Sequence, residues 1–233
     1  MLSLTPEKNL LITFLLMSVA AILMMMFSAF IAHSMALQHS EKGTKKLNQT
    51  VWLTIILISI WFGIAMSASL SGPIAFVQFL PYFAIPLVIG TLLIFQPVVS
   101  TLIQKIPTHW LINLQLYRVL GIVFIYPFYT DGLLTKGFAI NAGVGDVITG
   151  FAAVVVAYLV VRHGKRVQSL FYGWTAFGIL DLIVAPASAA YYGFAVNGAD
   201  IGFPVTIIPL FIGPPVGILL HIVTLRNFRL NYK

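Results

Sequence analysis

Long apolar runs recur along this chain, and each is long enough, at about 20 residues, to cross the hydrocarbon core of a bilayer. Hydrophobic residues make up 60% of the 233 residues and charged residues only 8%. A soluble domain is usually about 45–50% apolar and about 25% charged, so composition argues against a soluble globular protein. Continuous runs also differ from the alternating strands of membrane barrels. We therefore predict an all-α, polytopic integral membrane protein.

The apolar runs number seven, and short segments join them. We place the predicted membrane helices at residues 9–37, 51–71, 79–103, 110–130, 138–161, 169–192 and 203–225. The first run is too long for a secretory signal and its positive charges follow it, so we interpret it as a membrane helix. No soluble domain fits between the runs, so residues 1–233 are predicted to form a single seven-helix transmembrane domain.

The distribution of lysine and arginine gives the predicted orientation. With the N-terminus outside, ten of these residues fall in cytoplasmic segments and two, Lys8 and Lys136, fall in external ones. Short cytoplasmic loops of membrane proteins carry such an excess, so we predict an N-out, C-in membrane protein. The net charge of +7 is then a topology signal, and we expect no nucleic acid partner.

Two decapeptides suggest an internal repeat. Residues 81–90 read PYFAIPLVIG and residues 204–213 read PVTIIPLFIG, and both predicted helices run inward. Parallel repeats of three helices on either side of a fourth explain the match, and chance is the alternative. In the last span, Pro209 and Pro214 remove backbone donors, which predicts a kinked or partly unwound helix. That helix either acts as a hinge or only bends around its neighbours.

Ionisable side chains inside predicted spans are costly, and they usually face the interior of the bundle. Arg118, Asp146 and Asp181 lie about 12–18 Å below the outer ends of their helices, at about 1.5 Å per residue. Gln115 lies on the same helical face as Arg118. One interpretation is a structural ion pair. The other is a solvated site that binds substrate or a proton, because one arginine leaves the second carboxylate in need of a proton or a cation.

Glycines and histidines provide further candidates. Gly143 and Gly145 precede Asp146, and small residues let membrane helices approach closely, so we expect this helix to pack tightly against a neighbour. His33 and His221 are predicted at similar depths near the cytoplasmic side, and two such imidazoles are able to ligate a haem or a metal. Separate positions near the membrane interface are the alternative. Cysteine is absent, which excludes thiolate ligands and cysteine nucleophiles.

The polar residues of the second half form a pattern of their own. The segments QLYR at 115–118, AGVGD at 142–146 and GILD at 178–181 are followed by Pro209, Pro214 and His221. This pattern, over roughly residues 115–229, resembles a small uncharacterised family of bacterial polytopic membrane proteins. The resemblance implies that Gln115, Arg118, Asp146, Asp181 and His221 belong to one site.

Three further resemblances concern function. GVGD at 143–146 resembles the G-x-G-D motif of intramembrane aspartyl proteases, with Asp181 as second carboxylate, although presenilin-like enzymes place their other aspartate before this motif. The topology resembles microbial rhodopsins, but the span 203–225 contains no lysine for a Schiff base, which excludes retinal. The three-plus-one-plus-three plan resembles the SWEET and PQ-loop transporters.

The function that these features favour is transport of a small solute, with Arg118, Asp146 and Asp181 binding the substrate or a coupling proton. The expected partners are the lipid bilayer and a small-molecule ligand, and we do not expect an enzyme. A redox protein that holds haem through His33 and His221, a G-x-G-D hydrolase and a purely structural subunit are the alternatives.

Overall fold

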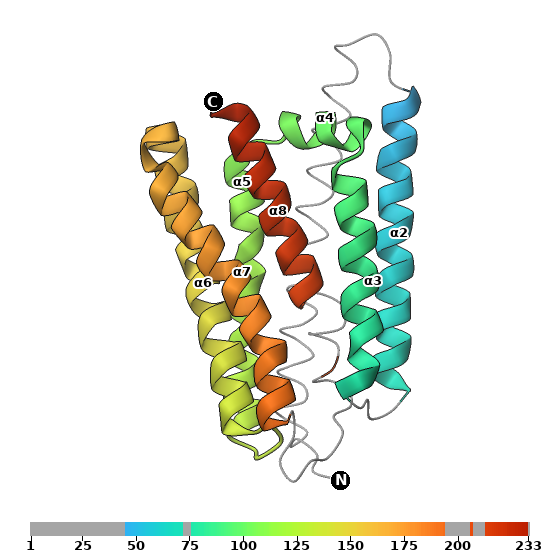
Figure 1. Ribbon diagram of the computed structural model, residues 1–233, viewed down its shortest axis with the longest axis vertical. Helices are drawn as coiled ribbons and strands as arrows, with labels where there is room; N and C mark the ends of the chain where they lie inside the picture. The colour runs from blue at the N-terminus through green and yellow to red at the C-terminus, as the bar shows by residue number, and fades with distance from the viewer. Residues whose placement is uncertain (1–44, 72–75, 194–205, 207–212, 233) are drawn as a thin grey trace.

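Helices are the only regular elements in the part of the chain that the computed structural model describes, which is residues 45–71, 76–193, 206 and 213–232. This confirms the predicted all-α class for those residues. The elements, labelled in Figure 1 where there is room, are α2 (Lys45–Leu70), α3 (Phe76–Ile94), α4 (Pro97–Lys105), α5 (Thr108–Leu114), η1 (Gln115–Gly121), η2 (Phe124–Tyr129), α6 (Lys136–His163), η3 (Gly164–Val167), α7 (Gln168–Tyr192) and α8 (Pro214–Asn231).

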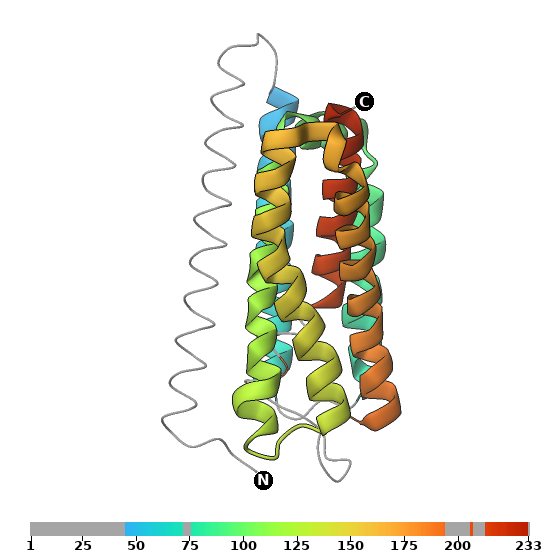
Figure 2. The same ribbon diagram turned by 90° about the vertical axis from the view of Figure 1, so that its left-hand side faces the viewer.

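Long apolar helices dominate the described residues. Two helical stretches, Thr108–Tyr126 and Lys136–Tyr192, are long and apolar enough to cross a membrane. Gln78–Ile94 and Val99–Lys105 make a third if a pair bent by 80° is counted as one span. The 57 residues of Lys136–Tyr192 contain both α6 and α7, which run antiparallel and are joined by η3 at the top of Figure 2. The predicted span 9–37 lies outside the described residues.

The predicted span 79–103 is not one straight helix. The structure breaks it between α3 and α4, and α4 lies across the end of the bundle (Figure 1). Pro97 is the cause, because it opens α4 and the residue before it, Gln96, is extended at φ −63° and ψ 138°. A residue that precedes proline is disfavoured in helical conformation. By contrast, α3 continues through Pro81 and Pro86.

The last predicted span also differs from the structure. Pro214 is the first residue of α8, which continues to Asn231, and residues 203–205 and 207–212 of the predicted span lie outside the described residues, so its predicted kink or unwinding stays a prediction. Proline is favoured at the first helical position, where its missing N–H is not needed. The consequence is that α8 begins halfway along the bundle (Figure 1). Pro209 and most of the second decapeptide lie outside the described residues.

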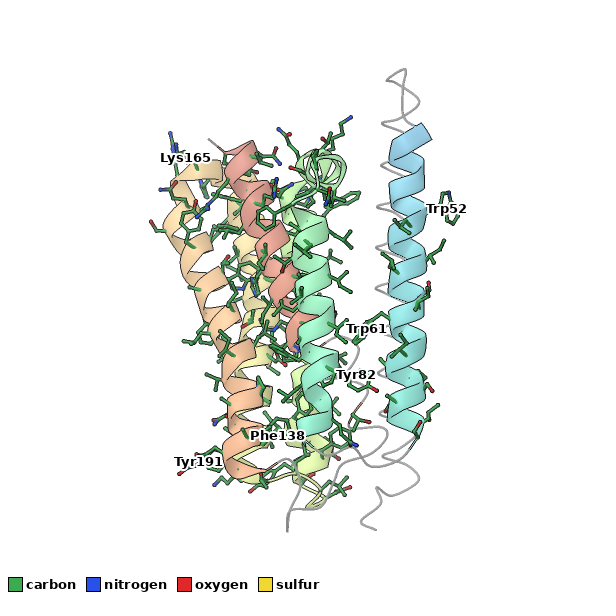
Figure 3. All side chains as sticks on the ribbon, turned by 45° about the vertical axis from the view of Figure 1, so that its right-hand side comes forward. Trp52, Trp61, Tyr82, Phe138, Lys165 and Tyr191 are labelled. Carbon is green, nitrogen blue, oxygen red and sulfur yellow. The ribbon has the colours of Figure 1, made fainter. Side chains whose placement is uncertain are left out.

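The described helices carry apolar side chains both in the core between helices and on the outer surface of the bundle. Phe128, Leu134 and Val160 are completely buried between helices. The outward surface is nonetheless apolar, with Leu92 at 65% and Phe151 at 60% exposure. A soluble monomer rarely exposes contiguous apolar surface of this kind, which marks a contact with protein or membrane. Side chains on α2, such as Trp52 in Figure 3, also point away from the other helices.

Basic residues gather at one end of the bundle. Lys105 ends α4, Arg162 lies in the last turn of α6 and Lys165 lies in η3. These segments and the C-terminal end of α8 lie together at the top of Figure 1. We refer to this end as the basic end, and to the other, where α7 ends and α6 begins, as the opposite end.

A buried asparagine joins three helices at the basic end. Asn227 of α8 is completely buried, and its Nδ2 donates hydrogen bonds to the carbonyl oxygens of Ile103 (2.6 Å) and Ile106 (2.8 Å). Its Oδ1 accepts a hydrogen bond from the hydroxyl of Thr108. Because these carbonyls lie where α4 ends, Asn227 fixes the corner between α4 and α5 to α8.

Replacing Asn227 with alanine should therefore destabilise the protein strongly. Each buried polar group left without a partner costs about 1–3 kcal/mol. The change removes a partner from three groups, of which the carbonyl of Ile103 still accepts the backbone N–H of Ile106. Thermal unfolding of the purified protein in detergent checks the prediction. Asn231→Ala on the same helix is the matched control, since Asn231 is exposed and makes one weaker hydrogen bond, to the carbonyl of Gln104 (3.3 Å). Equal melting temperatures for the two variants would contradict the role of Asn227.

Candidate functional site

Among the described residues with less than 2% exposure, Arg118 has the largest side chain, and it lies in a distorted part of its helix. The stretch that begins at Thr108 starts as an α-helix and tightens into the 3₁₀ segment η1, and the segment η2 that follows contains a kink, since Tyr126 is extended at φ −135° and ψ 123°. Arg118 belongs to η1 and is 1% exposed. Such departures from α geometry inside a helix are frequent at functional positions.

Glycines bring η1 and α6 into backbone contact, which places Asp146 beside Arg118. A Cβ atom at Gly143 would lie 2.8 Å from the carbonyl oxygen of Gly121, and one at Gly121 would lie 2.9 Å from that of Gly143. Two turns further along α6, a Cβ at Gly150 would meet the backbone of Val119 at 2.8 Å. Only glycine allows this approach, as in other closely packed membrane helices.

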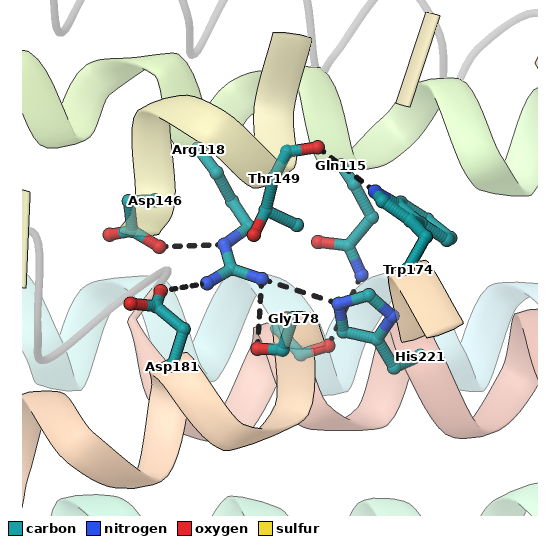
Figure 4. A network of polar contacts seen from close by, with 9 residues as sticks. Gln115, Arg118, Asp146, Thr149, Trp174, Gly178, Asp181 and His221 are labelled. Atoms are coloured by element: carbon teal, nitrogen blue, oxygen red, sulfur yellow. Dashed lines mark hydrogen bonds and ion pairs between the residues drawn. The ribbon is translucent and has the colours of Figure 1, made fainter. Parts of the chain in front are cut away.

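Arg118 binds groups from three other helices (Figure 4). Its Nε donates to Asp146 Oδ1 of α6 at 2.6 Å, and its Nη2 donates to Asp181 Oδ2 of α7. Its Nη1 donates to the carbonyl oxygen of Gly178 at 3.0 Å and to His221 Nε2 of α8 at 3.2 Å. Four of the five N–H bonds of the guanidinium are thus engaged. We call Arg118, Asp146, Asp181 and His221 the charge cluster.

Two glycines make room for the charge cluster. A Cβ at Gly145 would overlap the carboxylate of Asp181, and one at Gly178 would overlap the ring of His221 and lie 3.0 Å from Arg118 Nη1. Gly145 therefore has a position that differs from that of Gly143, because it faces α7 rather than η1. Both glycines were predicted to serve close packing, and the structure places both at close helix contacts.

The protonation state of His221 follows from its partner. A guanidinium N–H is only a donor, so His221 Nε2 must accept, and the ring proton is then on Nδ1. A neutral imidazole leaves the charge cluster with one guanidinium and two carboxyl groups. The ring of His221 also lies 5.0 Å from that of Trp174, whose Nε1 donates to the carbonyl of Thr149 at 3.1 Å. Within the described residues, the cluster therefore has one carboxyl group more than it has positive side chains.

Unsatisfied polar atoms lie on the basic side of the charge cluster. Gln115 donates from Nε2 to the carbonyl of Gly217 at 3.2 Å, but its Oε1 has no hydrogen-bond partner among the described residues. The same holds for Thr149 Oγ1, Thr175 Oγ1 and His221 Nδ1, and all four residues are nearly or completely buried. Buried polar atoms of this kind are usually satisfied by ordered water or a ligand.

A cavity lies on the other side of the cluster, towards the opposite end. It has a volume of about 180 Å³, and its walls are aromatic and aliphatic except where it reaches Tyr117, Arg118 and Asp146. Asp146 is the accessible member of the cluster, with its side chain 18% exposed against 0% for Arg118 and 8% for Asp181. Its second oxygen points away from the guanidinium (Figure 4). The cavity is lined by Phe79, Leu80, Phe83, Tyr117, Arg118, Leu120, Gly121, Phe124, Phe138, Ala142, Asp146, Leu182, Ala185, Pro186, Gly213 and Pro214.

The structure brings most of the residues selected from the sequence to one place. Gln115, Arg118, Asp146, Asp181 and His221 lie together (Figure 4), and Pro214 lines the cavity. His33 and Pro209 lie outside the described residues, so the pair of His33 and His221 is not placed. In the described part of the chain, no three His, Cys, Asp or Glu side chains gather as a metal site. The sequence did not point to Thr149, Trp174 or Thr175. Thr149 lies one helical turn from Asp146, and the other two lie one turn from Gly178, whose carbonyl binds Arg118.

The arrangement does not favour aspartyl protease chemistry. Both carboxylates bind the same guanidinium, Asp146 through Nε and Asp181 through Nη2. A catalytic dyad needs two carboxyl groups that bind mainly to each other and share one proton, whereas each of these carboxyl groups is bound to Arg118.

The fold and the site together define an all-helical protein whose long apolar helices enclose a buried Arg–Asp–Asp–His cluster. The chain belongs to the family described as Domain of unknown function (DUF8737), whose model matches residues 74–229, more than half of the chain. That range includes every residue of the charge cluster and of the cavity wall. Neither the curated proteins nor the solved structures contain a match.

Proposed function

We propose that this protein is a multi-pass permease of the bacterial inner membrane that carries a small solute through a bundle of seven helices. The observation that carries the proposal is the cavity that ends on Asp146 and Arg118. It provides a binding space on one side of the charge cluster, and buried polar atoms lie on the other side. A transport site needs access from both sides in turn, with a closed layer between them.

The orientation follows from the basic end. Lysines and arginines mark the cytoplasmic side of a membrane protein, so the basic end faces the cytoplasm and the cavity opens outwards. The N-out, C-in topology agrees with this placement. Apolar side chains on the outside of α3, α6 and α7 then face lipid.

Competition for Asp146 is the mechanism that the contacts support. In the structure, Asp146 shares Arg118 with Asp181. A solute or proton that binds Asp146 weakens its bond to Arg118, which keeps Asp181 as its partner. Because Arg118 also holds Gly178 and His221, this exchange changes the forces between α6, α7 and α8. Solute binding is thereby coupled to the packing of the helices around the cluster.

Substitution of the two aspartates tests the proposed function. We reconstitute the protein in liposomes containing a pH-sensitive dye and add a panel of small amines, carboxylic acids, amino acids and alcohols. At least one class should cause solute-dependent proton flux or uptake above that of empty liposomes. Asp146→Asn and Asp181→Asn should each lower it at least about tenfold, as expected when a charged hydrogen bond is lost.

The control is Asp131→Asn, which removes a carboxylate from the turn after η2, away from the cavity wall. It should transport like the wild type. Wild-type rates in both cluster variants, or no flux with any class, would refute the permease. An absorption spectrum of the same preparation tests the haem alternative, since bound haem gives a Soret band that should vanish in His221→Ala.

A further inference from the structure

We propose that the solute is a small organic cation with an apolar body, whose ammonium group binds the free oxygen of Asp146. The transport of this cation rests on the proposed permease function, but its binding does not. Three features of the cavity carry the inference: the charge at its inner end, the chemistry of the helix start beside it, and the nature and size of its walls.

The charge at the inner end favours a cation. Arg118 lines the cavity, but four of its N–H groups are already engaged and its side chain is 0% exposed, so it offers little to an anion. Asp146 is the exposed charge, and one of its oxygens points away from Arg118 (Figure 4). The cluster has two carboxyl groups and one guanidinium. A monocation at Asp146 would balance the second carboxylate, whereas an anion would add an uncompensated negative charge at low dielectric.

The start of α8 beside the cavity does not reverse this preference. A helix N-terminus normally attracts anions through its free N–H groups and its dipole. Here Gly213 and Pro214 line the cavity, but the first two helical residues are Pro214 and Pro215. Proline has no N–H, so two of the donors that an anion would need are missing.

The walls fit an apolar body next to a positive charge. Five of the lining residues are aromatic, namely Phe79, Phe83, Tyr117, Phe124 and Phe138. Aromatic faces attract cations, and more strongly where water is excluded. The volume of about 180 Å³ is close to the roughly 150 Å³ of an engineered apolar cavity that holds benzene. The expected ligand is thus an amine with a benzene-sized body.

Three ligands of equal size and different charge test the inference on the unmodified protein. Benzylamine is protonated at neutral pH, benzyl alcohol is neutral and benzoate is an anion. Binding to the full-length protein in lipid nanodiscs is measured by isothermal titration calorimetry. Benzylamine should bind at least about tenfold more tightly than benzyl alcohol, as expected for a charged hydrogen bond, and benzoate should not bind measurably. Equal affinities, a preference for benzoate or no binding of any of the three overturns the inference.

Two substitutions test whether benzylamine binds at Asp146. Asp146→Asn should reduce the affinity for benzylamine to that for benzyl alcohol, and Asp131→Asn should leave both unchanged. Unchanged benzylamine affinity in a folded Asp146→Asn protein overturns the assignment to this carboxylate. If Asp146→Asn does not fold, the comparison of the three ligands on the wild type still decides the question of charge.

Uptake of labelled benzylamine into proteoliposomes separates this inference from the proposed function. Selective binding without uptake, together with no flux of any class in the solute panel, supports the cation site and refutes the permease. Transport of a neutral or anionic solute that depends on Asp146, together with no binding of benzylamine, supports the permease and refutes the cation site.

Discussion

Replacing Arg118 with methionine should destabilise the protein by about 3–5 kcal/mol, the usual cost of removing one partner of a buried ion pair. Methionine retains much of the volume of the arginine stem but none of its donors. Asp146 and Asp181 would both lose the guanidinium, and the carbonyl of Gly178 and His221 Nε2 would lose a hydrogen bond. A lower melting temperature and less monodisperse protein after detergent extraction are the measurements.

A variant that removes all three charges tests whether the two unpaired carboxylates cause the instability of Arg118→Met. Buried ion pairs are often replaced by neutral residues of similar volume at little cost. The triple variant Arg118→Met with Asp146→Asn and Asp181→Asn should therefore recover most of the stability that Arg118→Met loses, while binding no benzylamine. A triple variant as unstable as Arg118→Met would show that the shape of arginine, rather than compensation of the two carboxylates, holds these helices together.

The second large effect is expected from a single methyl group. Gly178→Ala places a Cβ where the ring of His221 lies and 3.0 Å from Arg118 Nη1. The ring has little space to move, because His221 is completely buried and packs against Trp174. Overpacking of this kind costs about 1–3 kcal/mol, and separating α7 from α8 would also break the hydrogen bond from Arg118 to His221. We expect a lower melting temperature and reduced benzylamine binding.

Gly173→Ala provides the matched control on the same helix. A Cβ at Gly173 has no neighbour within 4 Å, and alanine is favoured over glycine in a helix interior by about 1 kcal/mol. This variant should be as stable as the wild type or slightly more stable. If Gly178→Ala and Gly173→Ala melt at the same temperature, α7 and α8 are packed less closely than the structure shows.

The charge cluster could be predicted from the sequence because ionisable residues are rare inside long apolar runs. An arginine and two aspartates inside apolar runs stand out without any knowledge of packing, and helix rise alone put them at one depth. The helix class followed from the same runs. The apolar runs therefore predicted the fold class, and the ionisable residues inside them predicted the site.

The ends of the helices and the cavity were harder to predict from the sequence. The end of α3 at Ile94 and the start of α8 at Pro214 are marked by prolines, but the apolar pattern continues across both and hides them. The cavity wall consists of phenylalanines and aliphatic residues, which occur throughout this chain and give no signal for one position. The space between them depends on how α3, η1, α6 and α7 pack, and no local pattern encodes that.

The contacts at the C-terminal end of α8 have a geometric consequence. This part is held by Asn227, by the stack of Phe228 on Phe171 with ring centroids 4.1 Å apart, and by the hydrogen bond from Arg226 to Ser100. Its first turn begins in the middle of the bundle at the cavity wall, and the hydrogen bonds of Gly217 and His221 lie close to it. When these two bonds break and the C-terminal contacts stay, α8 rotates about its basic end. For a helix of 18 residues, about 27 Å long, a rotation of about 10° displaces the first turn by about 5 Å. The residues at the cavity travel farthest while the corner with α4 stays in place.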